Sequence, residues 1–303
     1  MRNSHFLFAG TAKAGTTSIY EYLNQHPQVH IPVKETFYFL KEVYTDFSLG
    51  YPAQRAEEDL ILNEADYLKL YPEDPEKIHG EIGTGYLYHH RTSIPLIQKT
   101  LGKDVKILII LRNPVQRAYS SYMHFVKDVH ERLSFEDSLK KEEERKKLKY
   151  DFMWFHRDLG LYADQVEAFL KAFNQVKILI TEEFADNPEE GMKDIFEFLE
   201  IDPDVKLNFE KVYNKSGQPK SKGLQRLITQ ENVIKKTLRP AFRKLYSKEK
   251  REKIRKRVKN MNISGYRSMD PKIEAKLKDF YQEDVRKLEK LIGRPLLKWG
   301  FDE

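Results

Sequence analysis

Two glycines and a lysine form the first group of residues with the types and spacing that phosphate chemistry requires. The sequence "GTAKAGTT" at 10–17 contains Gly10, Lys13 and Gly15, and it follows an apolar run at 6–8 that predicts a strand. A strand, a tight turn and a helix start in this order present successive backbone N–H groups to an anion. We therefore predict a phosphate-binding loop in which the two glycines permit the turn and a close backbone approach.

The position of the lysine separates two kinds of phosphate loop. Nucleoside triphosphatases place a lysine directly after the second glycine, where it contacts the β- and γ-phosphates, and follow it with a hydroxyl residue that binds magnesium. In this chain Thr16 occupies that lysine position, and Lys13 comes three residues earlier. The loop is thus suited to a phosphate compound, but it lacks the nucleoside triphosphatase arrangement.

A second phosphate site is predicted where another strand meets a helix, in "LIILRNPVQRAYSSYMHF" at 108–125. Arg112 ends the apolar run, Asn113 can cap the next helix, and Pro114 suits its first position. Arg112 then lies at the carboxyl end of the strand, where open α/β sheets bind ligands. Ser120 follows two turns into the helix and could share the same anion. An arginine binds phosphate directly, whereas a magnesium enzyme favours aspartate at this point.

Strands and helices alternate along the chain. Short aliphatic runs typical of buried parallel strands occur at 5–10, 105–111 and 176–181. Helical patterns occur at 16–26, 93–102, 114–126, 158–173, 188–201 and 270–292. This order predicts an α/β fold with a mainly parallel sheet covered on both faces.

Two further segments are less regular. We interpret residues 40–77 as an irregular or helical insertion, and the charged segment at 140–149 as an exposed helix end or lid.

Composition narrows the class of protein. The 303 residues are interpreted as one domain, 1–303, because no proline- or glycine-rich linker divides them. With no cysteine there are no disulfides or thiolate metal sites, and the first apolar segment is too short to be a membrane anchor. We therefore expect a cytoplasmic protein.

The densely basic stretch 231–260 indicates a solvated helical face, an acidic substrate or an anionic membrane surface. No motif supports nucleic-acid binding.

The two phosphate segments together closely resemble the sulfotransferases that use 3′-phosphoadenosine 5′-phosphosulfate. In that family a loop similar to "TAKAGTTSIYEYL" holds the 5′-phosphosulfate, and a segment similar to "LRNPVQRAYSSY" holds the 3′-phosphate. "NQHPQVHIPVKETFYF" and "GEIGTGYLYHH" are similar to segments of the bacterial and heparan-sulfate-type branch, with Gly83 and Thr84 in place of its usual Thr-Pro. The resemblance implies a three-layer αβα architecture of the P-loop type, with the helices at 231–260 and 270–292 packed onto the single domain.

The resemblance also implies site residues. Lys13 would stabilise the leaving phosphate and Glu35 of "KETFYF" would act as general base. "PKSKGLQRL" resembles a loop that closes over the 3′-phosphate, although Leu224 replaces its arginine. No metal site is expected, because the histidines are scattered and no ligand spacing repeats. The residues implied to bind the donor are Lys13, Ala14, Gly15, Thr16, Thr17, Ser18, Arg112, Ser120, Lys222 and Gly223.

Several alternatives stay open from the sequence. His89 or His90 could be the base instead of Glu35, and Lys34 could bind the donor or the acceptor. The acceptor itself could be a saccharide, a lipid or a small metabolite with a hydroxyl or amine, and the sequence does not determine the oligomeric state. Two other functions compete with sulfuryl transfer: a P-loop nucleotide kinase or triphosphatase, and an inactive relative that only binds anions.

Overall fold

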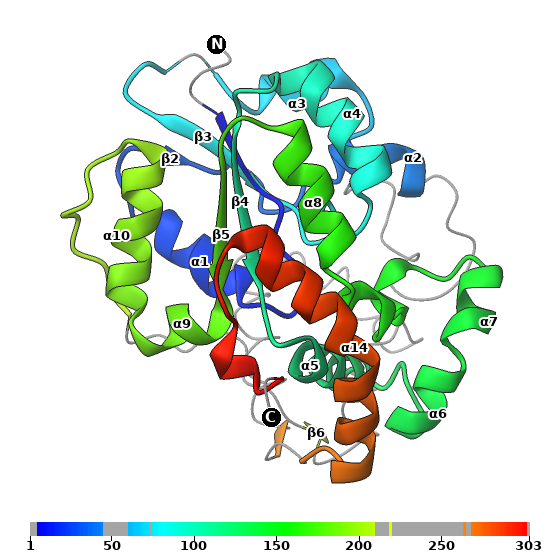
Figure 1. Ribbon diagram of the computed structural model, residues 1–303. Helices are drawn as coiled ribbons and strands as arrows, with labels where there is room; N and C mark the ends of the chain where they lie inside the picture. The colour runs from blue at the N-terminus through cyan, green and yellow to red at the C-terminus, as the bar shows by residue number, and fades with distance from the viewer. Residues whose placement is uncertain are drawn as a thin grey trace.

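A five-stranded parallel sheet forms the centre of the protein (Figure 1). The computed structural model describes residues 5–44, 60–72, 74–209, 218–219, 263–264 and 268–301, and structural statements below concern these residues. The sheet has the order β2-β3-β1-β4-β5, and each neighbouring pair is parallel. Its strands are β1 (His5–Phe8), β2 (Val29–His30), β3 (Ile78–Ile82), β4 (Lys106–Leu111) and β5 (Val176–Ile180).

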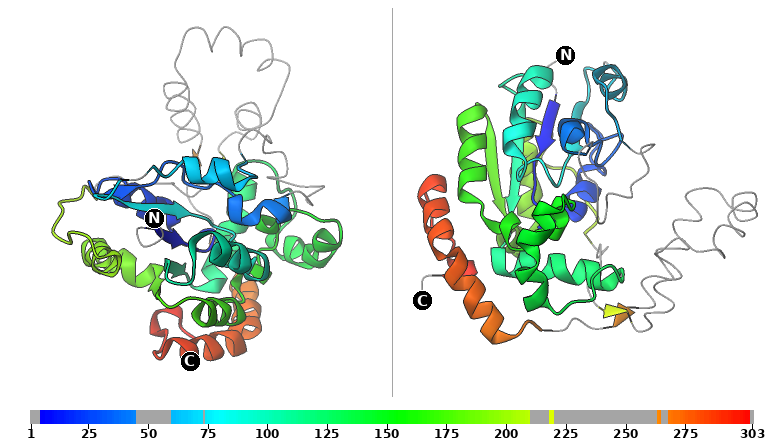
Figure 2. Two further views of the ribbon diagram at one scale, coloured as in Figure 1. Left: turned by 90° about the horizontal axis from the view of Figure 1, so that it is seen from above. Right: turned by 90° about the vertical axis from the view of Figure 1, so that its right-hand side faces the viewer.

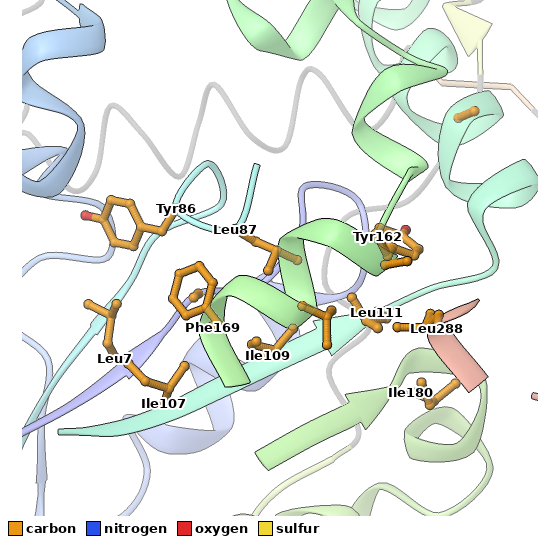
Figure 3. Close-up of a cluster of buried hydrophobic side chains, with 14 of the residues drawn as sticks. Leu7, Tyr86, Leu87, Ile107, Ile109, Leu111, Tyr162, Phe169, Ile180 and Leu288 are labelled. Atoms are coloured by element: carbon orange, nitrogen blue, oxygen red, sulfur yellow. The ribbon is translucent and has the colours of Figure 1, made fainter. Parts of the chain in front are cut away.

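Helices cover both faces of this sheet, which confirms the predicted three-layer αβα architecture. One face packs against α1 (Thr16–Leu23) and α10 (Pro188–Leu199), and the other against α4 (His90–Leu101), α5 (Pro114–Lys127), α8 (Ala163–Ala172) and α14 (Pro271–Ile292). Alternation along β4 explains the division. Leu108 and Ile110 join the first layer, while Ile107, Ile109 and Leu111 point into the second (Figure 3).

The shorter elements lie around this framework. α14 packs outside the second layer, against α8 and α5, at the C-terminal end of the chain (Figure 2). Short helices and turns connect the larger elements, and a two-stranded antiparallel ladder lies apart from the main sheet, with β6 against α5. These elements are η2 (Tyr38–Leu40), α2 (Lys41–Tyr44), α3 (Glu64–Lys69), α6 (Phe135–Lys140), α7 (Glu142–Lys147), η4 (Phe152–Trp154), η5 (Asp158–Gly160), α9 (Thr181–Asp186), β6 (Gln218–Pro219), β7 (Ile263–Ser264) and η6 (Leu297–Trp299).

Local capping places the start of α5 as the sequence predicts. The side chain of Asn113 accepts hydrogen bonds from the backbone N–H groups of Val115 at 3.0 Å and Gln116 at 3.3 Å, and Pro114 takes the first helical position. Because the cap ends the strand and starts the helix within two residues, Arg112 is held at the carboxyl end of β4.

The strand β3 was not among the predicted strands. Its sequence, "IHGEI", contains histidine, glycine and glutamate, yet all five residues are buried because β3 lies between β2 and β1. A Cβ atom at Gly80 would overlap the ring of Phe6 on β1, so the glycine permits close packing of the two strands. This segment therefore forms a strand because it pairs with β1 and β2, and not because of alternating apolar residues or high β propensity.

The segment at 140–149 is mostly exposed, as expected, but two of its side chains are buried. Within α7, Glu142 and Arg145 are buried, and the carboxylate of Glu142 accepts hydrogen bonds from the backbone N–H groups of Arg157 and Asp158 at 2.9 and 2.8 Å. This helix therefore fixes the chain after η4. The basic stretch 231–260 and part of the insertion at 40–77 lie outside the described residues.

Candidate functional site

The phosphate loop runs from the end of β1 to α1 across the carboxyl end of the sheet. The backbone N–H groups of Ala9 and Thr11 donate to the carbonyls of Leu108 and Ile110 on β4, at 2.7 and 3.2 Å. The strand order places the switch point of the fold between β1 and β4, because the chain continues from β1 to one side and from β4 to the other. Ligands of open α/β sheets bind at this point.

Two residues of the loop have left-handed backbone conformations, Lys13 with φ 73° and Gly15 with φ 91°. The glycine adopts this conformation freely, whereas the lysine pays about 1–2 kcal/mol for it. Such strain persists where the surrounding structure holds the residue in place, and it concentrates at functional sites. Lys13 is therefore held in a specific orientation at the turn.

Arg112 contacts this loop directly. Its Nη1 donates a hydrogen bond to the backbone carbonyl of Lys13 at 3.0 Å, and its own carbonyl accepts one from the hydroxyl of Tyr162 at 2.9 Å. The two segments predicted to bind phosphate thus meet at one position in the structure.

Sequence reasoning missed a residue that ties these segments together. Thr181 follows β5, and its hydroxyl lies 2.9 Å from the carbonyl of Ala14 and 2.8 Å from that of Leu111. The next residue, Glu182, accepts hydrogen bonds from the backbone N–H of Asn113 at 3.1 Å and from Nε1 of Trp299 at 3.0 Å. The only signal in the sequence was a threonine and two glutamates directly after a predicted strand.

The ammonium group of Lys13 is surrounded by other cations. Its pKa is lowered to about 8 by burial, the largest cause, and by the nearby charges of Lys127, Arg112 and Lys34, against an opposing effect of Asp128. Lys127 ends α5 and had no signal in the sequence beyond its charge. A cluster of partly buried cations at a helix start favours an anionic ligand, which would relieve their repulsion.

Lys34 links Glu35 to the first turn of α1. Nζ of Lys34 donates to the hydroxyl of Thr17 at 2.9 Å and lies 3.9 Å from Oε1 of Glu35. The Glu35 side chain is 17% exposed, so its carboxylate is neither in the core nor free in solvent. The structure therefore brings the predicted base and Lys34 to the predicted donor loop.

The two histidines have different surroundings. His89 caps the start of α4 and packs against the ring of Phe152, with ring centroids 5.1 Å apart, and burial lowers its pKa to about 4. His90 is the first residue of α4, and burial lowers its pKa as well. Both imidazoles are therefore weaker proton acceptors than an ordinary histidine.

The predicted 3′-phosphate residues are only partly described. Ser120 is 7% exposed and lies on α5, the helix that follows Arg112. The backbone of β6 lies against the same helix. Lys222 and Gly223 come shortly after β6 and lie outside the described residues.

Neither a metal cluster nor a membrane-spanning helix is present in the described ranges. They contain no group of three or more histidine, aspartate or glutamate side chains arranged to hold a metal ion. In the same part of the chain, none of the helices combines the length and the apolar character needed to cross a membrane.

Comparison with known proteins agrees with this geometry. The crystal structure of a sulfotransferase from Alicyclobacillus acidocaldarius superposes with a TM-score of 0.73 and 31% sequence identity, over 97% of each chain. The bifunctional heparan sulfate N-deacetylase/N-sulfotransferase of Drosophila melanogaster is 23% identical over 98% of this chain and 27% of its own. The membrane-associated sulfotransferase kil1 of Dictyostelium discoideum is 34% identical over 40% of this chain and 22% of its own.

This chain spans less than a third of the length of either of these two curated relatives. The profile of the sulfotransferase domain family, in contrast, matches residues 3–290, which is nearly the whole sequence. With the two phosphate segments joined at the switch point of a parallel sheet, this match shows that the chain belongs to the sulfotransferase domain family.

Proposed function

We propose that the protein transfers the sulfuryl group of 3′-phosphoadenosine 5′-phosphosulfate to a hydroxyl or amine acceptor. The observation that carries the proposal is the hydrogen bond from Arg112 to the Lys13 carbonyl, which joins the glycine-bracketed loop to an arginine at the end of β4, a residue type that binds phosphate directly. A donor with phosphates at both ends of its nucleoside matches these two sites. The 5′-phosphosulfate would lie on residues 13–18, and the 3′-phosphate on Arg112 and Ser120.

Lys13 is the proposed electrophilic residue. As the sulfur–oxygen bond to the 5′-phosphate breaks, negative charge develops on the oxygen that leaves with adenosine 3′,5′-bisphosphate. An ammonium group already oriented by the strained turn stabilises that charge without reorganising during the reaction. Lys34, Arg112 and Lys127 add positive potential around the same site.

Glu35 is the proposed general base. The acceptor oxygen or nitrogen forms the new bond to sulfur, and its proton passes to the Glu35 carboxylate. The position of Glu35 beside Lys34 and Thr17 supports this role, because the base must lie close to the bound phosphosulfate. Burial lowers the pKa of both His89 and His90, which weighs against either histidine as the base.

A saccharide is our first choice of acceptor. The Drosophila relative is named for heparan sulfate, and a carbohydrate sulfotransferase 15 of Rattus norvegicus is 24% identical over 66% of this chain. A lipid or a small metabolite is the alternative. We also propose that the 303 residues form one domain and that the reaction takes place in the cytoplasm.

Ligand binding tests the proposed donor first. We expect adenosine 3′,5′-bisphosphate to raise the melting temperature without any metal, with about 2.7 kcal/mol of stabilisation at a hundredfold excess over its dissociation constant. ATP with magnesium should have a much smaller effect. A preference for ATP with magnesium would contradict the proposal and favour a nucleotide kinase or triphosphatase.

Transfer of labelled sulfate from the donor to a panel of saccharides, lipids and small metabolites then tests the reaction. Glu35→Gln should lower kcat by about a hundredfold or more, because the glutamine amide cannot take up the proton of the acceptor. Glu76→Gln, at an exposed glutamate outside the site, serves as the matched control and should not change kcat. Binding of the bisphosphate without transfer to any acceptor would instead indicate an inactive relative.

A further inference from the structure

A second glutamate, Glu81, is buried directly behind the proposed base. It is the penultimate residue of β3, and only 1% of it is exposed. Its Oε1 accepts hydrogen bonds from the backbone N–H of Thr36 at 3.2 Å, from the Thr36 hydroxyl at 2.5 Å and from the hydroxyl of Tyr86. Two of the three donors therefore belong to the residue that follows Glu35.

The backbone around Glu35 is fixed to the same strand end. The N–H of Ile82 donates to the carbonyl of Lys34 at 3.1 Å, and the N–H of Tyr38 donates to the Thr36 hydroxyl at 3.2 Å. Glu35 thus lies between two anchored residues, one bonded to the backbone of β3 and the other to the Glu81 side chain.

A strained residue follows this anchor. Phe37 has φ 61°, in the left-handed region that bulky side chains avoid. This conformation costs about 1–3 kcal/mol and persists only where other contacts determine it. The bonds from Thr36 to Glu81 supply such contacts. They turn the chain sharply between Glu35 and the start of η2.

The surroundings of Glu81 make its carboxyl group expensive to bury. Burial raises its pKa, while the hydrogen bonds from Thr36 and Tyr86 act in the opposite direction. An apolar side chain would fill this place without that cost. What Glu81 contributes, and an apolar residue could not, is therefore its hydrogen bonds.

We infer that Glu81 is a positioning residue, which holds Lys34 and Glu35 against Thr17 of the donor loop through its hydrogen bonds to Thr36. This inference rests on the proposed function, since it gives Glu35 the role of base. The connection runs from Glu81 to Thr36, along the backbone to Glu35 and Lys34, and from Lys34 Nζ to the Thr17 hydroxyl. Glu81 itself takes no proton from the acceptor.

Steady-state kinetics of three variants test this role. Glu81→Ala leaves the Thr36 donors without their acceptor, so kcat should fall by about tenfold to a hundredfold through misplacement of the base. The donor KM and the bisphosphate affinity should stay within about twofold, because the donor loop has separate anchors: Arg112 bonds to the Lys13 carbonyl and Thr181 to the Ala14 carbonyl. Glu81→Gln, whose carbonyl can accept the same bonds, should restore most of kcat. Thr36→Val should be intermediate.

Amide hydrogen exchange in the donor-free protein supplies a readout that needs no activity. In Glu81→Ala, exchange over residues 34–38 should be about tenfold faster than in the wild type, since the local anchor is lost. Leu288→Ala is the matched control, because it removes core packing in α14, which packs against α8 and α5. It should lower the melting temperature and leave both kcat per folded protein and exchange at 34–38 unchanged.

The outcomes separate the two proposals. If the wild type binds the bisphosphate but sulfates nothing, the proposed function fails, while the exchange result still tests the anchor. If Glu81→Ala behaves like Leu288→Ala, with lower stability alone, the positioning role is wrong. Should Glu81→Ala not fold, Thr36→Val decides: unchanged kcat and unchanged exchange at 34–38 would overturn the inference.

Discussion

Nη1 of Arg112 donates a hydrogen bond to the backbone carbonyl of Lys13 across 3.0 Å, joining residues that are 99 positions apart in the chain. The bond links the carboxyl end of β4 to the turn after β1, and these two strands flank the switch point of the sheet. It orients the strained lysine and fixes the distance between the two proposed phosphate sites.

Two replacements of Lys13 should distinguish the effect of its charge on kcat from the effect of its backbone conformation on stability. Lys13→Ala and Lys13→Gly both remove the ammonium group, and both should lower kcat by about a hundredfold to a thousandfold. Because glycine tolerates φ 73° and alanine does not, the glycine variant should be about 1 kcal/mol more stable than the alanine variant. Steady-state kinetics and urea unfolding measure the two effects.

The exposed Lys69 provides the control for this pair. Lys69→Ala should leave kcat unchanged. Near-normal transfer by Lys13→Gly would show that the ammonium group does not stabilise the leaving phosphate.

The pH dependence of donor binding should report the Lys13 ammonium. Its pKa is lowered to about 8 in the donor-free protein, chiefly by burial, and a bound phosphate favours the charged form and raises it. At pH values below this pKa, the affinity for adenosine 3′,5′-bisphosphate should therefore not change with pH. Above it, affinity should fall by up to tenfold per pH unit until the pKa of the complex is reached.

Calorimetry in buffers of different ionisation enthalpy should detect proton uptake on binding between about pH 8 and pH 9. Lys13→Met should abolish this uptake. The same proton uptake in Lys13→Met would assign it to another group.

Recognition of the 3′-phosphate should depend on Arg112 and Ser120. The wild type should bind adenosine 3′,5′-bisphosphate much more tightly than adenosine 5′-monophosphate. Arg112→Lys should lose most of this discrimination, because the planar fork that binds phosphate is lost although the charge remains. Ser120→Ala should lose a smaller part, about threefold to tenfold.

Ser121→Ala is the control for the serine, since its hydroxyl bonds to the Met153 carbonyl and to His156 inside the core. It should affect stability and leave the ratio of the two affinities unchanged. Equal ratios in wild type and Arg112→Lys would remove Arg112 from the 3′-phosphate site.

Loss of the Thr181 hydroxyl should lower both the stability of the protein and its affinity for the donor. Thr181→Val removes the hydroxyl near the carbonyls of Ala14 and Leu111 while keeping the side-chain shape. A loss of about 1 kcal/mol should lower the melting temperature by about 2–4 °C, and bisphosphate affinity should fall severalfold as the loop loosens.

Thr100→Val is a stringent control, because the buried Thr100 hydroxyl has no hydrogen-bond partner in the described structure. This variant should be neutral or slightly stabilising, with unchanged affinity. Equal effects of the two valine substitutions would refute the bridging role of Thr181.

The sequence alone predicted the features of the structure that depend on neighbouring residues in the chain. Apolar runs predicted β1, β4 and β5, and the Asn113 cap with Pro114 predicted the start of α5, because these features depend on residues next to one another. The glycine turn and Arg112 indicated two phosphate sites and a sulfotransferase, and the fold and the family are confirmed. The roles of Lys13, Glu35, Arg112 and Ser120 stay predictions.

Only the tertiary structure revealed what depends on distant pairing. The polar strand β3 is buried because of its neighbours in the sheet, Thr181 reaches two segments at once, and Lys127 comes close to Lys13 through the length and direction of α5. Glu81 accepts a hydrogen bond from Thr36, which lies 45 positions earlier. The physical reason is that burial and hydrogen bonding between remote segments depend on how the strands assemble, whereas caps, turns and apolar runs depend on short stretches of chain.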